Sequence, residues 1–350
     1  MIAGFATPEG TARFASRFPA QATAGFYRPA QGISVSSLGL GSYLGEMDEA
    51  TDRGYRESVA EAMRGGLNFL DTSLNYRHQR SELSIGAALS DLLRRLELQR
   101  DEFVVSTKAG FLTPNAMPRV ALRPEDVVGN MHSMAPAFLA DQLGRSRENL
   151  GLETIDVFYI HNPETQLAFV DAGEFYRRIR VAFSYLEQAT KQGLIRYYGT
   201  ATWDGYRRRP GAPDGLSLEE MASIALDTGG VGHHFRYIQL PFNLAMPEAL
   251  AQTSSAGAVL EQAARLDITV VASASLLQAR LARDLPAELA VQFPGTHTDA
   301  QRAIQFTRST PGITVALVGM SNPVHVRENL AVSRLPALTE EQYSALYSKS

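Results

Sequence analysis

Short runs of β-branched and aromatic residues recur along the chain, and each ends in small or polar residues before a longer amphipathic stretch begins. Runs that are apolar almost throughout are typical of strands buried on both faces of a parallel sheet. The amphipathic stretches repeat apolar residues at helical spacing, as Phe183, Leu186 and Ala189 do. The pattern predicts eight strands, at Val35–Ser42, Asn68–Ser73, Phe103–Lys108, Ile155–His161, Arg196–Thr202, Tyr237–Phe242, Ile268–Ala274 and Thr314–Gly319.

Helices are expected between and after these strands. Several of them end at glycine, the residue that most easily adopts the left-handed conformation found just beyond a helix. One helix opens with Ser81 and Glu82 and runs through Ile85 to Leu92, with the acid placed to favour the helix N-terminus. The others are predicted at Tyr55–Arg64, Phe138–Leu150, Glu174–Gln192, Ser217–Leu226, Gly257–Leu266, Thr298–Ser309, Pro323–Val332 and Thr339–Ser348.

Strict alternation of strand and helix implies a parallel sheet, and eight such units imply an α/β fold closed into a single (β/α)8 TIM barrel over residues 33–350, including the C-terminal helices. Residues 1–32, rich in Gly, Ala and Pro, are predicted to form an N-terminal extension, in which a hairpin across the barrel floor would fit. The loops after strands 3 and 5, residues 109–135 and 203–216, exceed ordinary connection lengths. Both follow the C-terminal ends of strands, where barrel loops build binding sites, so we expect them to shape a pocket. Candidate apolar walls within them are Phe111, Met117, Trp203 and Tyr206.

The composition is that of an ordinary globular protein and excludes some chemistries. Hydrophobic residues make up 45% and charged residues 20% of the chain, with a net charge of −4 and a pI near 6.0. That charge gives no reason to expect nucleic acid or an anionic membrane as a partner. Cysteine is absent, which rules out disulfides, thiolate nucleophiles and Cys-based zinc sites. No apolar run approaches the length of a membrane span, and we expect a cytoplasmic protein.

Four chemically active side chains lie at or just after the ends of three consecutive predicted strands. Asp71 ends the second strand and Tyr76 follows on the loop, Lys108 ends the third strand, and His161 ends the fourth. Each alone has an ordinary explanation, as a helix cap, a loop residue, a solvated lysine or a turn residue. In a barrel, however, the C-terminal ends of all strands meet on one face, so the four side chains are expected to converge.

Together these groups predict general-acid chemistry at a carbonyl. Asp71 would hold Lys108 charged, and the ammonium group would lower the pKa of Tyr76. Tyr76 could then give a proton to a developing alkoxide near neutral pH, while His161 hydrogen-bonds the same carbonyl oxygen through Nε2 and orients it. The set contains no nucleophile and no metal-binding cluster, so the reaction requires an external reductant or oxidant.

The chain resembles the aldo-keto reductase superfamily of NAD(P)H-dependent (β/α)8 oxidoreductases. The matching segments are Gly39-Leu-Gly-Ser42, Asn68-Phe-Leu-Asp-Thr-Ser-Leu-Asn-Tyr76, Ser106-Thr-Lys108, Ile155-Asp-Val-Phe-Tyr-Ile-His161 and, beyond Gly319, Arg327-Glu-Asn329, in family order across residues 33–335. The resemblance implies hydride transfer from nicotinamide to a small aldehyde or ketone, with Tyr76 as acid, Asp71 and Lys108 tuning it, and His161 orienting the carbonyl. The implied cofactor is NADPH, with NADH as the other candidate.

The resemblance also implies cofactor ligands, with departures from the family pattern. The implied ligands are Gly41, Ser42, Asp71, Thr202, Gln239, Ser275, Leu276, Gly319, Ser321, Arg327, Glu328 and Asn329. Ala201 and Thr202 stand where the family commonly has Ser-Asn, and Ser273 stands where an aromatic ring commonly stacks on the nicotinamide. Gly319 occupies the position of a lysine that binds the 2′-phosphate in several members, and Arg327 could substitute for it. The preference between NADPH and NADH is therefore open.

Two alternatives to a reductase are weighed against this interpretation. A barrel that binds the cofactor as a sensor or regulatory subunit, as potassium-channel β subunits do within the family, would fit the altered strand-5 and strand-7 positions. The intact set of Asp71, Tyr76, Lys108 and His161 argues against it. An unrelated isomerase or lyase could use Lys108 as a Schiff base, but a neighbouring Asp71 would keep the amine protonated. The physiological substrate, the reaction direction and the oligomeric state are not determined by the sequence.

Overall fold

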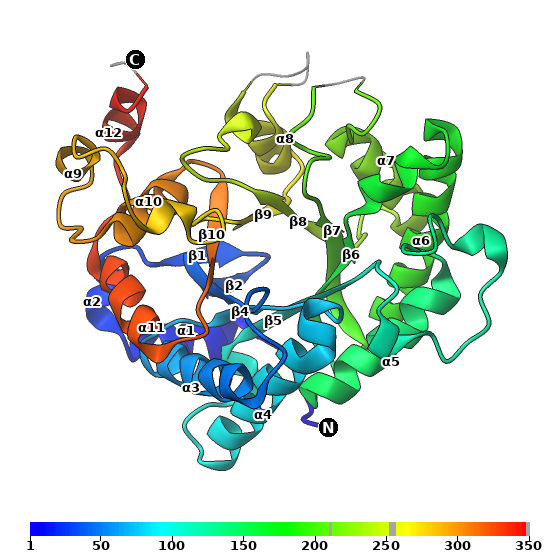
Figure 1. Ribbon diagram of the computed structural model, residues 1–350, viewed down its shortest axis with the longest axis horizontal. Helices are drawn as coiled ribbons and strands as arrows, with labels where there is room; N and C mark the ends of the chain where they lie inside the picture. The colour runs from blue at the N-terminus through cyan, green and yellow to red at the C-terminus, as the bar shows by residue number, and fades with distance from the viewer. Residues whose placement is uncertain (210–211, 252–256, 348–350) are drawn as a thin grey trace.

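A closed barrel of eight parallel strands forms the centre of the molecule (Figure 1). The computed structural model describes residues 1–209, 212–251 and 257–347. Neighbouring strands follow chain order, and the last strand pairs with the first to close the ring. The barrel strands are β3 (Leu38–Gly41), β4 (Phe69–Asp71), β5 (Val104–Ala109), β6 (Ile155–His161), β7 (Ile195–Ala201), β8 (Phe235–Pro241), β9 (Thr269–Ser273) and β10 (Ile313–Gly319). The predicted barrel is confirmed, and each of the eight predicted strands overlaps one of its strands.

Helices cover the outside of the barrel (Figure 1). At the start of α3, Asp48 accepts a hydrogen bond from the amide of Thr51, and at the end of α5 Gly151 adopts a φ of 70°. The predicted helices are present as α3 (Glu49–Arg64), α4 (Arg80–Arg94), α5 (Pro136–Leu150), α6 (Ala172–Lys191), α7 (Leu218–Gly229), α8 (Val259–Arg265), α10 (Asp299–Ser309), α11 (Pro323–Leu330) and α12 (Glu340–Ala345). Ser348, the predicted end of the last helix, lies outside the described residues. One short helix that the pattern does not predict, α9 (Leu289–Gln292), precedes α10.

The N-terminal segment packs against the lower part of the barrel. It holds the helices α1 (Pro8–Ser16) and α2 (Pro19–Thr23) and a hairpin of β1 (Tyr27–Ala30) and β2 (Ile33–Ser36). The expected hairpin is present, but the two helices are not predicted, because at 9 and 5 residues neither shows a sustained period. The predicted first strand, Val35–Ser42, is wrong at its start. Its first two residues belong to the hairpin, and the barrel strand begins only at Leu38.

Alternate residues of a strand point to the same face of the sheet, and along the inward face of β4 and β5 the residues change from apolar at the start of the strand to polar at its end. In β4, Phe69 lies in the inner apolar cluster, and Asp71 follows two residues later. In β5, Val104 lies in the same cluster, and Ser106 and Lys108 follow at intervals of two. The parallel register pairs Asp71 with Ser106. The sequence therefore places its polar groups together at the C-terminal ends of the strands.

The two long loops are partly ordered by short structures of their own. Within residues 109–135, isolated β-bridges join His132 to both Phe111 and Val128. Residues 210 and 211 of the predicted segment 203–216 lie outside the described residues. Short 3₁₀ segments lie between the described helices and strands: η1 (Tyr76–Gln79), η2 (Arg100–Glu102), η3 (Pro114–Ala116), η4 (Pro124–Asp126), η5 (Pro163–Ala168), η6 (Glu248–Leu250), η7 (Arg280–Ala282) and η8 (Ala331–Arg334). In the described parts of the chain, no helix has the length and apolar character needed to cross a membrane.

Candidate active site

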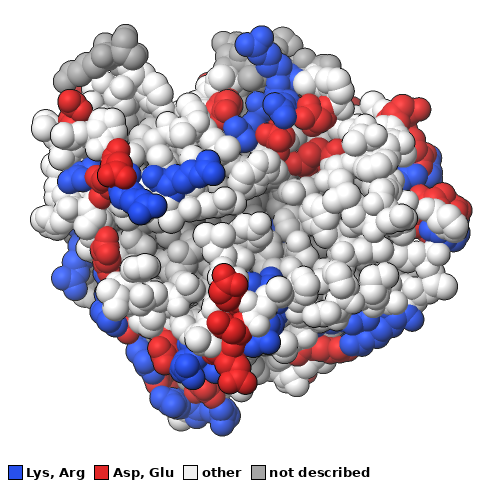
Figure 2. Space-filling view, in the orientation of Figure 1, with Lys and Arg blue, Asp and Glu red and all other residues white. Residues whose placement is uncertain are grey.

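A cavity of about 490 Å³ opens at the C-terminal ends of the barrel strands. Asp71, Tyr76 and His161 line it, and Lys108 lies fully buried behind them. Figure 2 shows a hollow near the middle of the visible face, with mostly uncharged side chains around it and the charged ones gathered toward the rim. The four side chains that the sequence places on separate strands and loops are thus brought to one pocket.

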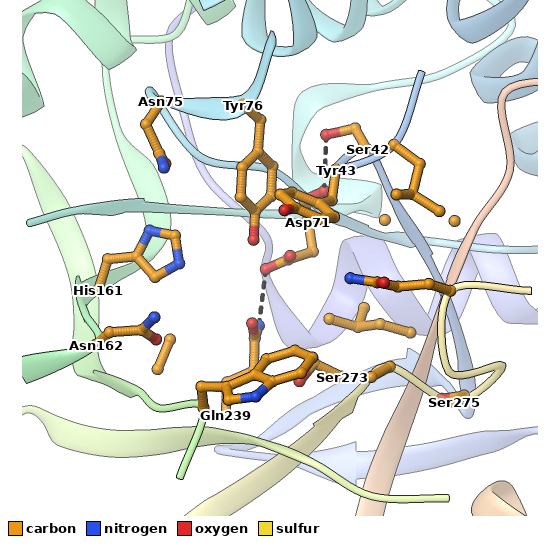
Figure 3. A pocket seen from close by; sticks show the side chains of 18 of the residues that line it. Ser42, Tyr43, Asp71, Asn75, Tyr76, His161, Asn162, Gln239, Ser273 and Ser275 are labelled. Atoms are coloured by element: carbon orange, nitrogen blue, oxygen red, sulfur yellow. Dashed lines mark hydrogen bonds between the residues drawn. The ribbon is translucent and has the colours of Figure 1, made fainter. Parts of the chain in front are cut away.

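Asp71 is the centre of the hydrogen-bond network beneath the pocket. Its Oδ1 accepts bonds from the Ser106 hydroxyl (2.7 Å) and from the side-chain amide of Gln239 (2.9 Å), and its Oδ2 accepts one from Lys108 Nζ (2.6 Å). Lys108 also donates to the carbonyl of Thr72 at 2.7 Å. Figure 3 shows the bond between Gln239 and Asp71 as a dashed line. Three donors therefore satisfy a carboxylate that is almost fully buried.

The pKa of Tyr76 does not follow the expectation from the sequence. Burial raises it well above the usual value of 10.0, and the negative charge of Asp71 raises it further. The Lys108 ammonium lies 4.8 Å from the centroid of the phenol ring, but burial also lowers the pKa of Lys108, a change that the charge of Asp71 partly offsets. The predicted lowering of the Tyr76 pKa is therefore wrong, because desolvation outweighs the attraction of the ammonium group. Tyr76 keeps its proton at neutral pH, as a proton donor must.

His161 stands beside Tyr76 at the end of β6. Its ring meets the rings of Tyr76 and Phe111 edge to face, with centroids 5.7 Å and 5.2 Å away. Burial lowers the pKa of His161 well below 6.5, and the charge of Lys108 lowers it further. The imidazole is thus neutral at pH 7 and carries one proton, on either Nδ1 or Nε2. Nδ1 lies 3.2 Å from the hydroxyl of Ser73.

A second buried histidine, His132, supports the backbone of His161. Arg178 donates to Gln166 Oε1 (2.7 Å), so the Gln166 amide nitrogen faces His132 Nδ1 (2.9 Å) and donates to it. His132 must then carry its proton on Nε2, which lies 2.8 Å from the carbonyl oxygen of His161. Gly110 lies beside this contact, because a Cβ added to it would come within 2.4 Å of that oxygen and 2.7 Å of His132 Nε2. Sequence reasoning missed His132, because it lies inside a long loop with no periodic pattern.

The predicted apolar walls are only partly correct. Phe111 and Trp203 line the pocket, whereas Met117 and Tyr206 do not. Met117 is exposed on its loop, and Tyr206 is buried. Trp203 is held by Glu164, a buried residue that the sequence did not indicate, whose carboxylate accepts a 2.6 Å bond from the Trp203 amide.

Most of the implied cofactor ligands line the same cavity. These are Gly41, Ser42, Asp71, Thr202, Gln239, Ser275, Leu276 and Gly319. The hydroxyl of Ser275 is buried and has no hydrogen-bond partner among the described residues. Gln239 donates its amide nitrogen to Asp71, which leaves its carbonyl oxygen as an acceptor at the pocket wall. A hydroxyl and an amide oxygen at one wall suit a carboxamide ligand, so the residues present fit a nicotinamide ring.

The implied ligands for the adenosine end lie apart from this cavity, on α11 and the turn before it. They are Ser321, Arg327, Glu328 and Asn329. Arg327 is exposed and forms an ion pair with Glu61 of α3 at 3.3 Å. Gly319 is exposed at the end of β10, and a Cβ added to it would meet no heavy atom within 4 Å. The basic residue that could meet a 2′-phosphate here therefore already has an acidic partner.

Comparison with known proteins identifies relatives of the chain. The model of the Aldo/keto reductase family matches residues 37–209, which include Asp71, Tyr76, Lys108 and His161. The chain is 30% identical over 180 residues to D-threo-aldose 1-dehydrogenase of a Pseudomonas species, an alignment that covers 49% of this chain and 51% of that protein. The match thus spans about half the length of this relative.

Two further similarities extend over most of the chain. A putative voltage-gated potassium channel subunit beta of Schizosaccharomyces pombe is 24% identical over 331 residues, covering 89% of this chain and 88% of that protein. The crystal structure of an aldo/keto reductase from Klebsiella pneumoniae in complex with NADP and acetate matches with a TM-score of 0.64 and 18% identity, covering 91% and 92% of the two chains. At that identity, the structural match shows a shared fold.

Proposed function

This chain belongs to the aldo-keto reductase superfamily, and on that premise we propose that it reduces a small aldehyde or ketone to an alcohol with NAD(P)H. The bound cofactor would supply the hydride. The observation that carries the proposal is the convergence of Tyr76, Lys108, Asp71 and His161 at one largely uncharged pocket. The proposed partner is therefore a small carbonyl compound, and the proposed location is the cytoplasm.

The proton for the product oxygen comes from Tyr76 in this proposal. Its raised pKa keeps the phenol protonated until negative charge develops on the substrate oxygen. When the proton leaves, the ammonium group of Lys108, 4.8 Å from the ring centroid, would stabilise the phenolate, and Asp71 and the carbonyl of Thr72 hold that ammonium group in place. The neutral ring of His161, which stands beside Tyr76, orients the same carbonyl oxygen.

The same arrangement argues against covalent chemistry at Lys108. Its amine donates to Asp71 and to the Thr72 carbonyl, which ties two of its protons to the barrel. A Schiff-base lysine needs a free lone pair. Membership in the superfamily also makes the unrelated barrel considered from the sequence wrong.

We propose NADPH as the cofactor, with NADH bound nearly as well. Thr202, Gln239 and Ser275 would hold the carboxamide. Arg327 would have to exchange its ion pair with Glu61 for a 2′-phosphate, which reduces the gain from that contact. Strong discrimination between the two cofactors is therefore not expected.

Binding and turnover can be tested separately. Trp203 is the only tryptophan and lines the pocket, so its fluorescence should report titration with NADPH or NADH. A panel of aldehydes and ketones then tests turnover by cofactor absorbance, with Tyr76→Phe as the matched control. Turnover that falls by about 10²-fold or more in Tyr76→Phe, with cofactor affinity nearly unchanged, is the expected result. Equal turnover in the two proteins would refute Tyr76 as the acid.

A cofactor-binding regulatory barrel is the second candidate function. The similarity to a putative potassium channel subunit beta over 331 residues supports it, as do the unusual Ala201, Thr202 and Ser273 at the cofactor wall. Tight cofactor binding without turnover of any carbonyl in the panel would favour this function over the reductase.

A further inference from the structure

The catalytic candidate His161 has a hydroxyl partner on the side away from the substrate oxygen. Ser73, fully buried just after β4, places its Oγ 3.2 Å from His161 Nδ1. The same oxygen lies 2.6 Å from Oδ1 of Asn75 and 3.1 Å from the carbonyl oxygen of Lys108. One hydroxyl thus has three neighbours that can accept its proton.

Counting protons shows that the direction of this hydroxyl decides the tautomer of His161. If Ser73 donates to Asn75 or to the Lys108 carbonyl, its oxygen is left to accept, so Nδ1 of His161 must carry the ring proton and Nε2 is bare. If Asn75 instead turns its amide nitrogen toward Ser73, the nitrogen donates to Oγ and the hydroxyl can donate to Nδ1. Nε2 of His161 then carries the proton.

Only one of the two tautomers of His161 can assist carbonyl reduction. A carbonyl oxygen only accepts hydrogen bonds, so His161 can orient it only when Nε2 carries the proton. Because the buried imidazole ring is neutral, only one of its two nitrogens carries a proton. His132 binds the backbone carbonyl of His161 and not its ring, so it leaves the choice to Ser73.

We propose that Ser73 is a positioning residue that donates to Nδ1 and thereby keeps the proton of His161 on Nε2, and that the amide of Asn75 sets the direction of the Ser73 proton. The inference rests on the proposed reductase function, which requires a donor at Nε2. Asn75 lines the cavity, and Figure 3 shows its side chain pointing toward His161. A ligand in the pocket is therefore placed to act on the amide and, through Ser73, on the histidine.

The tautomer can be measured directly and without turnover. Protein labelled with ¹⁵N at its seven histidines gives long-range ¹H–¹⁵N spectra that separate protonated from bare ring nitrogens, and a His161→Asn variant assigns the signals. In wild-type protein with NADP⁺ we expect His161 to be protonated on Nε2. In Ser73→Ala that form should lose its dominance, and Ser73→Thr, which keeps the hydroxyl, should restore it. A wild-type ring protonated on Nδ1, or the same tautomer ratio in Ser73→Ala, would overturn the proposal.

The role of Asn75 needs a variant of the same shape that cannot donate. In Asn75→Asp the carboxylate accepts the Ser73 proton, so the neutral form of His161 with its proton on Nε2 should disappear from the spectrum. Persistence of that form would show that Asn75 does not direct the Ser73 hydroxyl.

Kinetics separate positioning from simple structural support. Ser73→Ala should lower kcat for carbonyl reduction by about tenfold, the effect of one ordinary hydrogen bond, with NADPH affinity within about twofold of wild type. Ser73→Thr should recover most of the loss. A parallel fall in cofactor affinity and melting temperature, without recovery in Ser73→Thr, would mean that Ser73 only supports the fold. The ¹H–¹⁵N spectra need no substrate. A wild-type protein that reduces no carbonyl compound would therefore refute the proposed function, while the spectra would still decide whether Ser73 controls the tautomer of His161.

Discussion

The buried ion pair of Asp71 and Lys108 is the arrangement on which the proposed chemistry depends most, and it can be tested through stability alone. The change is Asp71→Asn, which keeps the shape of the side chain but removes its charge. Lys108 then remains fully buried, with the Thr72 carbonyl, the Tyr76 ring and an uncharged amide near its ammonium group. The charge of Glu82 also acts on it, but Glu82 is not its hydrogen-bond partner. Lys108→Met removes the other charge while keeping the length of the side chain.

The expected cost follows from the geometry. At the 2.6 Å separation of Lys108 Nζ and Asp71 Oδ2, the direct attraction is about 6 kcal/mol in a medium of effective dielectric constant 20. Desolvation of both charges cancels much of it in the intact pair, but removing one partner of a buried pair costs about 3–5 kcal/mol. For a chain of 350 residues, that cost corresponds to a fall in melting temperature of about 4–7 °C. The double variant, with neither charge, should cost less than the sum of the two single variants.

The assay is thermal and guanidinium unfolding of the wild type, both single variants and the double variant, followed by circular dichroism. A coupling energy of about 2 kcal/mol or more from this double-mutant cycle is expected. Single variants that cost less than about 1 kcal/mol, or losses that simply add, would show that the pair is not a buried, mutually compensating ion pair. The role assigned to Lys108 beside Tyr76 would then fail with it.

Three further predictions concern the cofactor, the pocket wall and the pH dependence of stability. Gly319→Lys should tighten NADPH binding several-fold and leave NADH binding unchanged in fluorescence titrations, because it adds a charge-assisted contact without a clash; no change would place the 2′-phosphate elsewhere. Glu164→Ala should raise KM for the carbonyl substrate more than it changes cofactor affinity, because it frees the backbone of Trp203; an unchanged KM would exclude Trp203 as a substrate wall. Burial lowers the pKa of His132 to about 4 from 6.5, so the unfolded chain binds the extra proton first as the pH falls, and stability is lost between those values. From pH 7 to pH 5 the wild type should lose about 2 kcal/mol more than His132→Gln in urea unfolding; equal losses would contradict a buried neutral His132.

The barrel and the positions of the main reactive groups could be predicted from the amino-acid sequence. Strands of period two, such as Phe69–Asp71 and Val104–Ala109, place apolar side chains below and polar ones above on the same inward face. Closure of eight parallel strands then brings every C-terminal end to one rim. Asp71, Lys108 and His161 could be located because each is the last or nearly the last residue of its own strand. The position of each residue at its strand end can be recognised from a few neighbouring residues of the sequence.

The surroundings of these groups and their pKa values depend on the folded structure. Gln239 donates to Asp71 across 168 positions of the chain, and Glu61 pairs with Arg327 from another helix. The pKa of Tyr76 rises where proximity to Lys108 predicts a fall, because the cost of burial depends on every neighbour that excludes water. Hydrogen-bond partners and desolvation are set by distances across the fold and leave no period or motif in the chain, which is why the reactive residues were predictable and their supporting contacts were not.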